Sequence, residues 1–362
     1  MVGNSGNLIV TGGSGFIGSN LVRWLLKNTE YLVHNLDALT YAGNNDSLSD
    51  CVENDRYNFW NVDITNAPDI ERVFDEVRPD KIMHLAAESH VDRSIDNPAA
   101  FIKTNVIGTY VLLENARRHF DSLTGDEKSG FRFLHVSTDE VYGSLGPTGL
   151  FNESTPYSPH SPYSASKAAS DHLARAWHDT YNLPVLVTNC SNNYGPYQFP
   201  EKLIPVTIIN AIAGNRIPVY GQGENVRDWL HVLDHCDAMY RVLSSGTVGH
   251  TYNIGGNNEL RNIDLVRLIC EILDVERPRG DGLVYSSQIE FVVDRPGHDL
   301  RYAIDASKIS SELDWEPAYS CREGIQQTIE WYLSNEDWWK SILDGKYRLE
   351  RQGVKQIFTG KL

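Results

Sequence analysis

The chain has 362 residues, of which 41% are hydrophobic and 22% charged, and its formal net charge is −16. This length and apolar content predict one large or two ordinary globular domains with a substantial core, and they exclude disordered and collagen-like classes. The acidic total, with no stripe of lysine and arginine to offset it, excludes a nucleic-acid-binding chain, and any phosphate ligand must be bound by a few local cations.

The first half of the chain alternates short apolar runs with amphipathic stretches. The predicted strands are residues 8–11, 31–36, 57–62, 81–86, 131–137 and 184–189, and the predicted helices are 20–27, 68–77, 98–120 and 162–181. Strand–helix alternation of this kind requires right-handed crossovers and builds a parallel, doubly wound sheet. The expected fold class is therefore α/β and Rossmann-like.

The rhythm changes after Asn193, where proline, glycine and aromatic residues become frequent. Helices are expected at 203–214 and 262–273, and the strand-like run at 251–254 is expected to return to the first sheet. We expect residues 1–193 to form a cofactor-binding domain and 194–362 to form a smaller α/β substrate domain. The two are interleaved, with segments near 230–256 returning to the first.

Cysteine usage and apolar run lengths indicate the compartment. The five cysteines are widely spaced and form no CxxC pair, so neither a metal site nor a disulfide framework is expected. The start of the chain has no basic region followed by a long apolar run, and the longest apolar run, 203–213, is too short to span a bilayer. We expect a reduced, soluble, cytoplasmic protein with no membrane partner.

A glycine-rich loop, Gly13-Ser-Gly15-Phe-Ile-Gly18, follows the first strand and opens the first helix. The glycines permit a tight turn and a close approach of the backbone to a pyrophosphate, which the helix N-terminus stabilises. Asp37 follows Gly18 at the end of the second strand, where a carboxylate accepts from a ribose 2′-hydroxyl and repels a 2′-phosphate. The pattern predicts NAD rather than NADP, with FAD as the rival cofactor.

Two further strand ends are candidate cofactor contacts. Asp63 and Ile64 close the third strand, where an adenine edge would lie. Leu85, Ala86 and Ala87 close the fourth, where small side chains let a cofactor pack close to the backbone. Both sets are also compatible with ordinary tight packing at a strand end, so they support the cofactor site only together with the glycine loop.

Tyr163 and Lys167 form a Tyr-x-x-x-Lys pair at the start of the helix that follows the fifth strand. Spacing of four places both on one helix face, and an ammonium beside a phenol is expected to lower the tyrosine pKa towards neutrality. The phenolate then serves as a base for an alcohol proton while a hydride leaves the same carbon. Thr138, at the end of the fifth strand, can hydrogen-bond the reacting oxygen.

Two adjacent carboxylates, Asp139 and Glu140, follow Thr138 at the same strand end. Epimerisation needs only the tyrosine and the cofactor, because the hydride leaves and returns at one carbon. Elimination of water also needs a base for a carbon-bound proton and an acid for the departing hydroxyl, and this pair supplies both. The carboxylates therefore favour a dehydratase over an epimerase.

Together, the glycine loop and Tyr163–Lys167 resemble the extended short-chain dehydrogenase/reductase family over nearly the whole chain. Its members use NAD to modify nucleotide sugars, and their second domain binds the nucleotide diphosphate. The segments 85–95, 137–143, 192–205 and 294–302 resemble its 4,6-dehydratase branch. This resemblance implies dTDP-glucose as substrate, NAD regenerated at each turnover, a role in deoxysugar synthesis such as that of dTDP-rhamnose, and a homodimer that pairs helices 98–120 and 162–181.

The resemblance also implies the remaining ligand contacts. Further cofactor contacts are expected at Gly12, Phe16, Ile17, Leu39, Thr40, Ser89, Thr104 and Asn193, beside Tyr163 and Lys167. Substrate contacts are expected at Ser89, Thr138, Asn192, Lys202, Leu203, Pro218, Tyr220, Arg227, Asn262, Arg295 and His298. The arginines suit a diphosphate because a guanidinium makes bidentate hydrogen bonds to it. A UDP-hexose 4,6-dehydratase, an epimerase or decarboxylase of the same family, and a catalytically silent NAD-binding scaffold remain alternatives.

Overall fold

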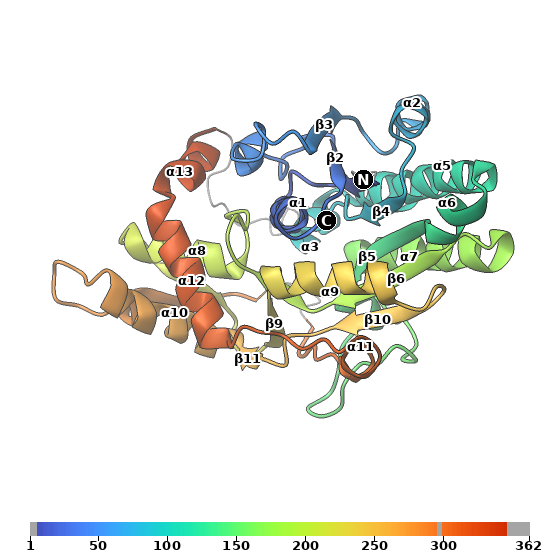
Figure 1. Ribbon diagram of the computed structural model, residues 1–362. Coiled ribbons are helices and arrows are strands. Elements are labelled where there is room, and N and C mark those ends of the chain that lie inside the picture. The colour runs from blue at the N-terminus through green and yellow to red at the C-terminus, as the bar shows by residue number, and fades with distance from the viewer. Residues whose placement is uncertain (1–5, 295–298, 346–362) are drawn as a thin grey trace, which may run out of the picture.

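A seven-stranded parallel sheet forms the centre of the protein in the computed structural model, which describes residues 6–294 and 299–345 (Figure 1). The strand order is β10–β6–β5–β4–β1–β2–β3. The strands are β1 (Asn7–Thr11), β2 (Leu32–Asp37), β3 (Tyr57–Asn61), β4 (Lys81–His84), β5 (Arg132–Thr138), β6 (Val185–Cys190) and β10 (Thr251–Ile254). This parallel order, with helical crossovers between successive strands, confirms the expected Rossmann-like class.

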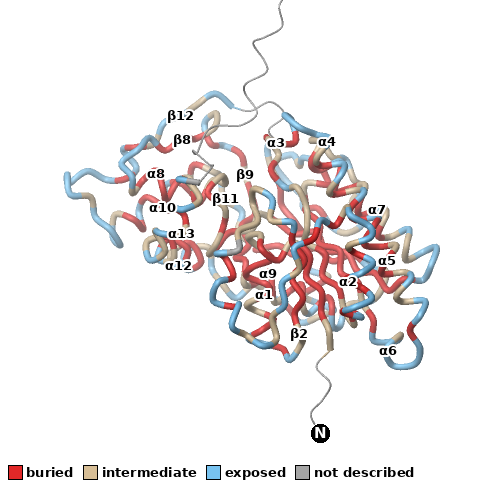
Figure 2. Tube along the Cα trace, turned by 90° about the horizontal axis from the view of Figure 1, so that it is seen from above, coloured by how far each residue is buried: buried red, intermediate tan, exposed pale blue. Residues whose placement is uncertain are grey.

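Helices cover both faces of this sheet, because alternate strand residues point to opposite sides. Leu8 and Val10 of β1 pack in one apolar cluster with α1 (Phe16–Asn28) and α9 (Val232–Ser245). Ile9 packs in a second cluster on the other side, with α2, α5 and α7. These three helices are α2 (Ala67–Val77), α5 (Thr109–Ser122) and α7 (Pro162–Tyr181). Figure 2 shows the buried chain concentrated along the strands between these layers.

The helix predicted at 98–120 is divided in three. It runs as α4 (Pro98–Phe101), a π-helical segment η2 (Ile102–Gly108) and then α5. Short helices that the sequence pattern did not predict lie at α3 (Val91–Asp96) and α6 (Gly125–Gly130). π-Helical segments inside α-helices are frequent at functional sites, and this one carries Thr104.

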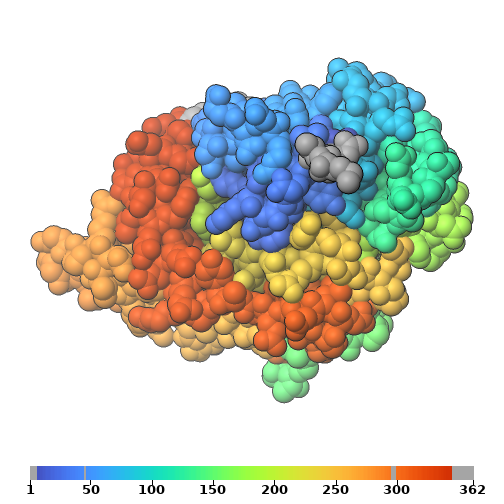
Figure 3. All heavy atoms as spheres, viewed as in Figure 1, coloured from blue at the N-terminus to red at the C-terminus, as the bar shows by residue number. Residues whose placement is uncertain are grey.

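A second lobe contains two small sheets and four helices. One sheet has the order β11–β9–β7 and the other pairs β12 with β8. The strands are β7 (Asn192–Tyr194), β8 (Ile217–Tyr220), β9 (Val226–His231), β11 (Glu259–Arg261) and β12 (Ile289–Val292). The helices are α8 (Leu203–Ile212), α10 (Asn262–Glu276), α12 (Cys321–Ser334) and α13 (Glu336–Gly345). Figure 3 shows the later part of this lobe, in orange and red, gathered on one side of the molecule.

The chain crosses between the lobes more than once. After β9 it returns to the first sheet as α9 and β10, and β10 pairs in parallel with β6. The helix α11 (Ser307–Leu313) comes later in the chain and packs against β10 and α9. In the described residues, no helix combines the length and the apolar character needed to cross a membrane.

Candidate active site

A cavity of about 580 Å³ opens where the carboxyl ends of the central strands face the second lobe. Its lining comes from the turns after β1, β2, β4 and β5, from the start of α7, and from β7, α8, β8, β9 and α10. In open α/β sheets, ligands bind outside the carboxyl ends of the strands, at the point where the chain stops adding strands on one side of the first strand and begins adding them on the other. The glycine loop, the turn at Asp139 and Glu140, and Tyr163 of α7 therefore border one cavity.

Three glycines at this loop leave no room for a side chain. Gly12 has a φ of +72°, and a Cβ there would lie 2.7 Å from the Ala86 backbone. A Cβ on Gly18 would lie 2.1 Å from the Gly12 carbonyl oxygen, and one on Gly13 would lie 2.2 Å from Oδ1 of Asn35. The loop thus brings the N-terminus of α1, which begins at Phe16, against the cavity.

The Asp37 carboxylate is held at the end of β2 by backbone amides. Ser14 N–H donates to its Oδ2 at 2.9 Å, and Leu39 N–H donates to its Oδ1 at 2.8 Å. Burial raises the pKa of Asp37, although both hydrogen bonds act in the opposite direction. Each carboxylate oxygen has a second lone pair that these amides do not use. The Asp37 side chain lines the cavity, so a ligand hydroxyl there can donate to it.

These residues fit a dinucleotide. The glycine loop leaves backbone N–H groups and a helix N-terminus beside the cavity for a pyrophosphate, and Asp37 accepts from a ribose hydroxyl. Asp63 and Ile64 border the cavity at the end of β3, and Leu85 to Ala87 border it at the end of β4. These positions would hold NAD.

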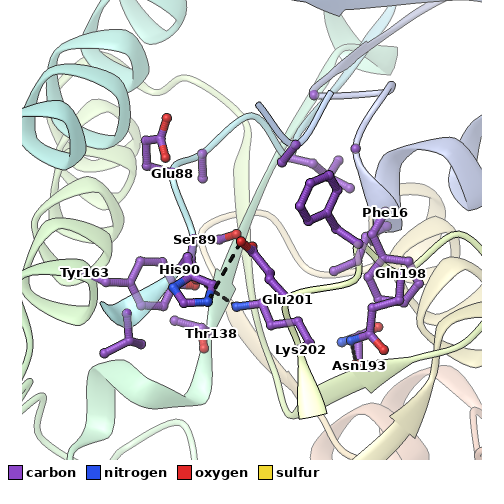
Figure 4. Close-up of a pocket in the computed structure, with 18 of the residues that line it drawn as sticks. Phe16, Glu88, Ser89, His90, Thr138, Tyr163, Asn193, Gln198, Glu201 and Lys202 are labelled. Atoms are coloured by element: carbon purple, nitrogen blue, oxygen red, sulfur yellow. Dashed lines mark hydrogen bonds and ion pairs between the residues drawn. The ribbon is translucent and has the colours of Figure 1, made fainter. Parts of the chain in front are cut away.

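Tyr163 and Thr138 lie together on one side of the cavity, with Phe16, Gln198 and Asn193 on the other (Figure 4). Tyr163 belongs to the first turn of α7, which begins with a capping box between Ser161 and Ser164. Burial and the nearby Glu140 carboxylate raise the pKa of Tyr163 well above its usual range, and its hydrogen bond with Thr138 opposes them.

Lys167 does not act on Tyr163 as the sequence spacing predicted. Lys167 is buried, and its ammonium donates to the Val136 carbonyl oxygen at 2.8 Å. The expectation that this cation brings the tyrosine pKa towards neutrality is wrong for this structure, because burial and the carboxylates of Glu140 and Asp139 dominate. Burial also lowers the pKa of Lys167 itself.

Asp139 is the most strongly perturbed carboxyl group of the site. It is 2% exposed, and its Oδ1 accepts from the Thr138 hydroxyl at 3.3 Å. Burial, then the nearby Glu140 and Asp228 carboxylates, raise the pKa of Asp139 well above its usual range. Its Oδ2 has no hydrogen-bond partner among the described residues. A buried carboxyl group that lines the cavity and has a raised pKa is suited to give a proton to a ligand.

The second lobe contributes two half-buried amide side chains whose buried oxygens have no partner in the described chain. They are Oδ1 of Asn192 and Oδ1 of Asn262, and both side chains line the cavity. A buried acceptor left without a hydrogen bond costs about 1–3 kcal/mol, so a ligand donor is the expected partner. These positions agree with the substrate-binding role expected for both residues.

Two predicted phosphate ligands, Lys202 and Arg227, also line the cavity. The Lys202 ammonium donates to the Ser89 carbonyl oxygen at 3.4 Å. The Arg227 guanidinium lies 4.3 Å from the Tyr302 ring centroid and donates to the Asp299 carbonyl oxygen at 2.9 Å. The predicted ligands Arg295 and His298 lie outside the described residues.

The cavity brings together nearly all of the described residues selected from the sequence. Gly13 and Leu39 are the exceptions, since neither borders it. The others that border it are Gly12, Gly15, Phe16, Ile17, Gly18, Asp37, Thr40, Asp63, Ile64, Leu85, Ala86, Ala87, Ser89, Thr104, Thr138, Asp139, Glu140, Tyr163, Lys167, Asn192, Asn193, Lys202, Leu203, Pro218, Tyr220, Arg227 and Asn262.

Sequence reasoning assigned no role to a charged cluster on the cavity wall. The Glu201 carboxylate lies 3.9 Å from Nε2 of His90 and 3.7 Å from Nε of Arg93, and the Tyr41 hydroxyl donates to it at 3.4 Å. Figure 4 shows His90 and Glu201 facing one another beside Lys202. His90 and Glu201 belong to segments that had already been selected by resemblance. Their ionisable side chains at strand and helix ends could have identified them as candidate site residues.

Comparison with known proteins matches this chain to a family of sugar-modifying enzymes. The family described as GDP-mannose 4,6 dehydratase matches residues 9–328. A dTDP-glucose 4,6-dehydratase of Xanthomonas campestris is 58% identical over 346 residues, which cover 96% of this chain and 98% of the relative.

Two solved structures have the same architecture. A dTDP-glucose 4,6-dehydratase from Bacillus anthracis in complex with NAD is 47% identical, with a TM-score of 0.83 over 93% of this chain and all of that one. A dTDP-glucose 4,6-dehydratase from Streptomyces venezuelae, with NAD and dTDP bound, is 45% identical, with a TM-score of 0.84 over 93% of this chain and 99% of that one.

Proposed function

The chain belongs to the GDP-mannose 4,6-dehydratase family, and because the relatives described above are dTDP-glucose 4,6-dehydratases, we propose that it converts dTDP-glucose to dTDP-4-dehydro-6-deoxy-glucose and water. It is an NAD-dependent lyase. The observation that carries the proposal is the buried Asp139, which lies beside Thr138, Glu140 and Tyr163 and whose pKa is raised well above its usual range by burial. A hydro-lyase needs such an acid, and an epimerase does not.

The first step oxidises the sugar at C4. Tyr163 receives the 4-hydroxyl proton on its phenol oxygen while Thr138 hydrogen-bonds the same sugar oxygen. When bound, NAD would supply the hydride acceptor for C4, the hydride donor for C6 and a positive charge in the same cavity. That charge would oppose the burial and the nearby carboxylates that raise the pKa of Tyr163, and Lys167 is a second cation that lines the same cavity. Oxidation comes first because the 4-keto group makes the C5 proton acidic enough for a carboxylate base.

Elimination follows across C5 and C6. Glu140 takes the C5 proton, and Asp139 gives a proton to the C6 hydroxyl, which leaves as water. The two carboxyl groups are adjacent in the chain but differ in surroundings, since Asp139 is buried and Glu140 is partly exposed. Two acids in unlike environments can hold opposite protonation states at one pH, as an acid–base pair requires. Hydride return to C6 and reprotonation of C5 by Glu140 form the product, and net transfer of the Tyr163 proton to Asp139 restores both groups for the next turnover.

The second lobe binds the nucleotide diphosphate in this proposal. Lys202 and Arg227 supply the local positive charge, and Asn192 and Asn262 supply hydrogen bonds to the sugar and the nucleoside. Carboxylates outnumber cations on the cavity wall, so attraction of the anion depends on these few side chains and on the N-terminus of α1.

One incubation separates the candidate activities. With dTDP-glucose and NAD, a dehydratase yields a 4-keto product that absorbs in strong alkali, whereas dTDP-galactose as the only product would identify an epimerase. Parallel incubations with UDP-, CDP- and GDP-glucose test the base preference, and a UDP-hexose dehydratase would prefer the UDP sugar. A catalytically silent NAD-binding scaffold would bind NAD and convert none of these sugars.

We extend the proposal to the setting of the enzyme. Its product feeds deoxysugar synthesis, for example that of dTDP-rhamnose, in the cytoplasm, and the five unpaired cysteines are compatible with a reducing compartment. The protein acts as a homodimer that pairs the α4–η2–α5 stretch and α7. Ile102, Ile107 and Tyr110 on this stretch and Tyr181 on α7 are between 44% and 50% exposed, which supports a covered apolar face. Light scattering of the wild type and of Tyr110→Asp tests the dimer, which the new charge should dissociate.

A further inference from the structure

A fully buried carboxylate lies behind the proposed catalytic pair. Asp171 is on α7, four residues after Lys167, and is 0% exposed. Spacing of four places the two side chains on the same face of the helix. Neither the motif analysis nor the mechanism above gives Asp171 a role.

The Asp171 carboxylate is held by hydrogen bonds from two other parts of the chain. Its Oδ1 lies 3.0 Å from Nε2 of His135 on β5, and its Oδ2 accepts from the Ser137 hydroxyl on β5 at 2.8 Å. The Tyr157 hydroxyl, from the segment before α7, donates to the same Oδ2 at 2.9 Å. Three hydrogen bonds to a buried carboxylate favour its charged form.

The protonation of the neighbours is consistent with this arrangement. Burial raises the pKa of Asp171, but the hydrogen bond with His135, the charge of Lys167 and the Ser137 hydrogen bond outweigh it and hold that pKa below its usual range. Burial lowers the pKa of His135 to about 4, so its imidazole is neutral and can donate through Nε2–H. Asp171 is therefore a buried anion at neutral pH.

Lys167 needs an anion of this kind. Burial of an ammonium without a compensating charge disfavours the protonated form. Burial lowers the pKa of Lys167, and the Asp171 carboxylate makes the largest contribution in the opposite direction. Cys190 also acts on the ammonium, but its thiol is neutral at pH 7 because burial raises its pKa to about 12.

We propose that Asp171 is the counter-charge of Lys167, a positioning residue whose buried carboxylate keeps the ammonium protonated so that Lys167 can support proton transfer at Tyr163. The catalytic meaning of this pair rests on the function proposed above. The ionisable groups that face the pair are His84 on β4, His135 on β5, Tyr142 in η3 (Asp139–Tyr142), Tyr157, Arg175 on α7 and Cys190 on β6. The Arg175 guanidinium donates to the Tyr157 hydroxyl at 2.6 Å and to Oγ1 of Thr251 at 3.1 Å, and the Asp171 charge also acts on it.

The first test is the pH profile of kcat for Asp171→Asn. Without the carboxylate, Lys167 loses its proton at lower pH, so the alkaline limb should move to lower pH by about one unit or more. Tyr157→Phe is the matched control, because it removes one hydrogen bond to Asp171 and leaves the charge in place. It should lower the melting temperature without moving the alkaline limb. An unchanged limb in Asp171→Asn, or an equal shift in Tyr157→Phe, would overturn the proposal.

The second test needs no turnover and no folded Asp171→Asn protein. Asp171, with a lowered folded-state pKa, contributes stability above its unfolded pKa, and that stability is lost as pH falls through the folded value. Lys167→Met raises the folded value, so its acid-side loss of stability in denaturant unfolding should begin at higher pH than in the wild type. The exposed Lys27→Met serves as control and should follow the wild-type curve. If Lys167→Met also follows it, Asp171 is not the counter-charge.

The two proposals fail in different ways. A wild type that converts no dTDP-glucose refutes the proposed function, while the unfolding curves still decide whether Asp171 and Lys167 are coupled. A dehydratase whose Lys167→Met curve matches the wild type keeps its function and loses this inference.

Discussion

Replacing Asp139 with asparagine should make the protein more stable and nearly inactive. An amide has almost the shape of a protonated carboxyl group, so the Thr138 hydroxyl can keep its hydrogen bond. The amide cannot give a proton to the C6 hydroxyl. General acid catalysis contributes about 10²- to 10⁴-fold, so turnover of dTDP-glucose should fall by about that factor, which is about 3–5 kcal/mol in the barrier.

The gain in stability follows from the raised pKa of Asp139 in the folded state. In the unfolded chain an aspartate ionises with a pKa near about 3.9. Between that value and the raised folded one, the folded state binds the extra proton, so wild-type stability falls as pH rises, by up to about 1.4 kcal/mol per pH unit. The amide of the Asp139→Asn variant has no proton to bind, so the stability of the variant should exceed that of the wild type increasingly as pH rises above the unfolded-state pKa.

Two measurements check this reasoning on the same preparations. Urea unfolding at several pH values gives the difference in unfolding free energy, and a single turnover with dTDP-glucose separates oxidation from elimination. The near-ultraviolet absorbance of the reduced cofactor should rise and persist in Asp139→Asn, because the sugar is oxidised but loses no water. A variant with wild-type turnover, or one whose stability does not gain on the wild type as pH rises, would refute the buried-acid assignment.

Three further substitutions test the rest of the site. Glu140→Gln should retain NAD, measured by titration, and lose turnover by about 10²- to 10⁴-fold; full activity would exclude Glu140 as the C5 base. Gly18→Ala should weaken NAD binding about tenfold or more, because its Cβ would lie 2.1 Å from the Gly12 carbonyl oxygen, and unchanged affinity would contradict the tight loop. Phe101→Ala removes a ring that is 1% exposed and lies 6.2 Å from the Tyr163 ring, so denaturant unfolding should show a loss of about 3–5 kcal/mol; a loss below about 1 kcal/mol would mean that the space is refilled.

Local patterns were sufficient to predict the central sheet. Most of strands β1 to β6 are apolar runs between turn residues, although β3 has no buried residue. Helix α7 begins and ends at the predicted residues because Pro162 starts it and Asn182 ends it in a left-handed conformation. The pattern missed α9, whose polar residues Asp234 and His235 are buried by tertiary contacts. The π-helical segment was also missed, since hydrophobic spacing does not distinguish it from an α-helix.

For the site, sequence predicted which residues meet but not how they titrate. The strand-end rule and the resemblance brought the glycine loop, Asp139 and Tyr163 to one cavity. The direction of the Tyr163 pKa was missed because it depends on burial and on Glu140, which are properties of the assembled fold. The spacing of Lys167 could not reveal that its ammonium would bind the Val136 carbonyl oxygen.

The place of β10 at the edge of the central sheet has a consequence for how the chain folds during synthesis. Its partner β6 is buried along its whole length, but β10 is translated about sixty residues later, after β7, α8, β8, β9 and α9. Until then the β6 edge is an unpaired template on which another nascent chain could assemble. The central sheet therefore cannot be completed until part of the second lobe has been translated. We expect the ribosome-bound chain to depend on chaperone protection until Ile254 has left the exit tunnel.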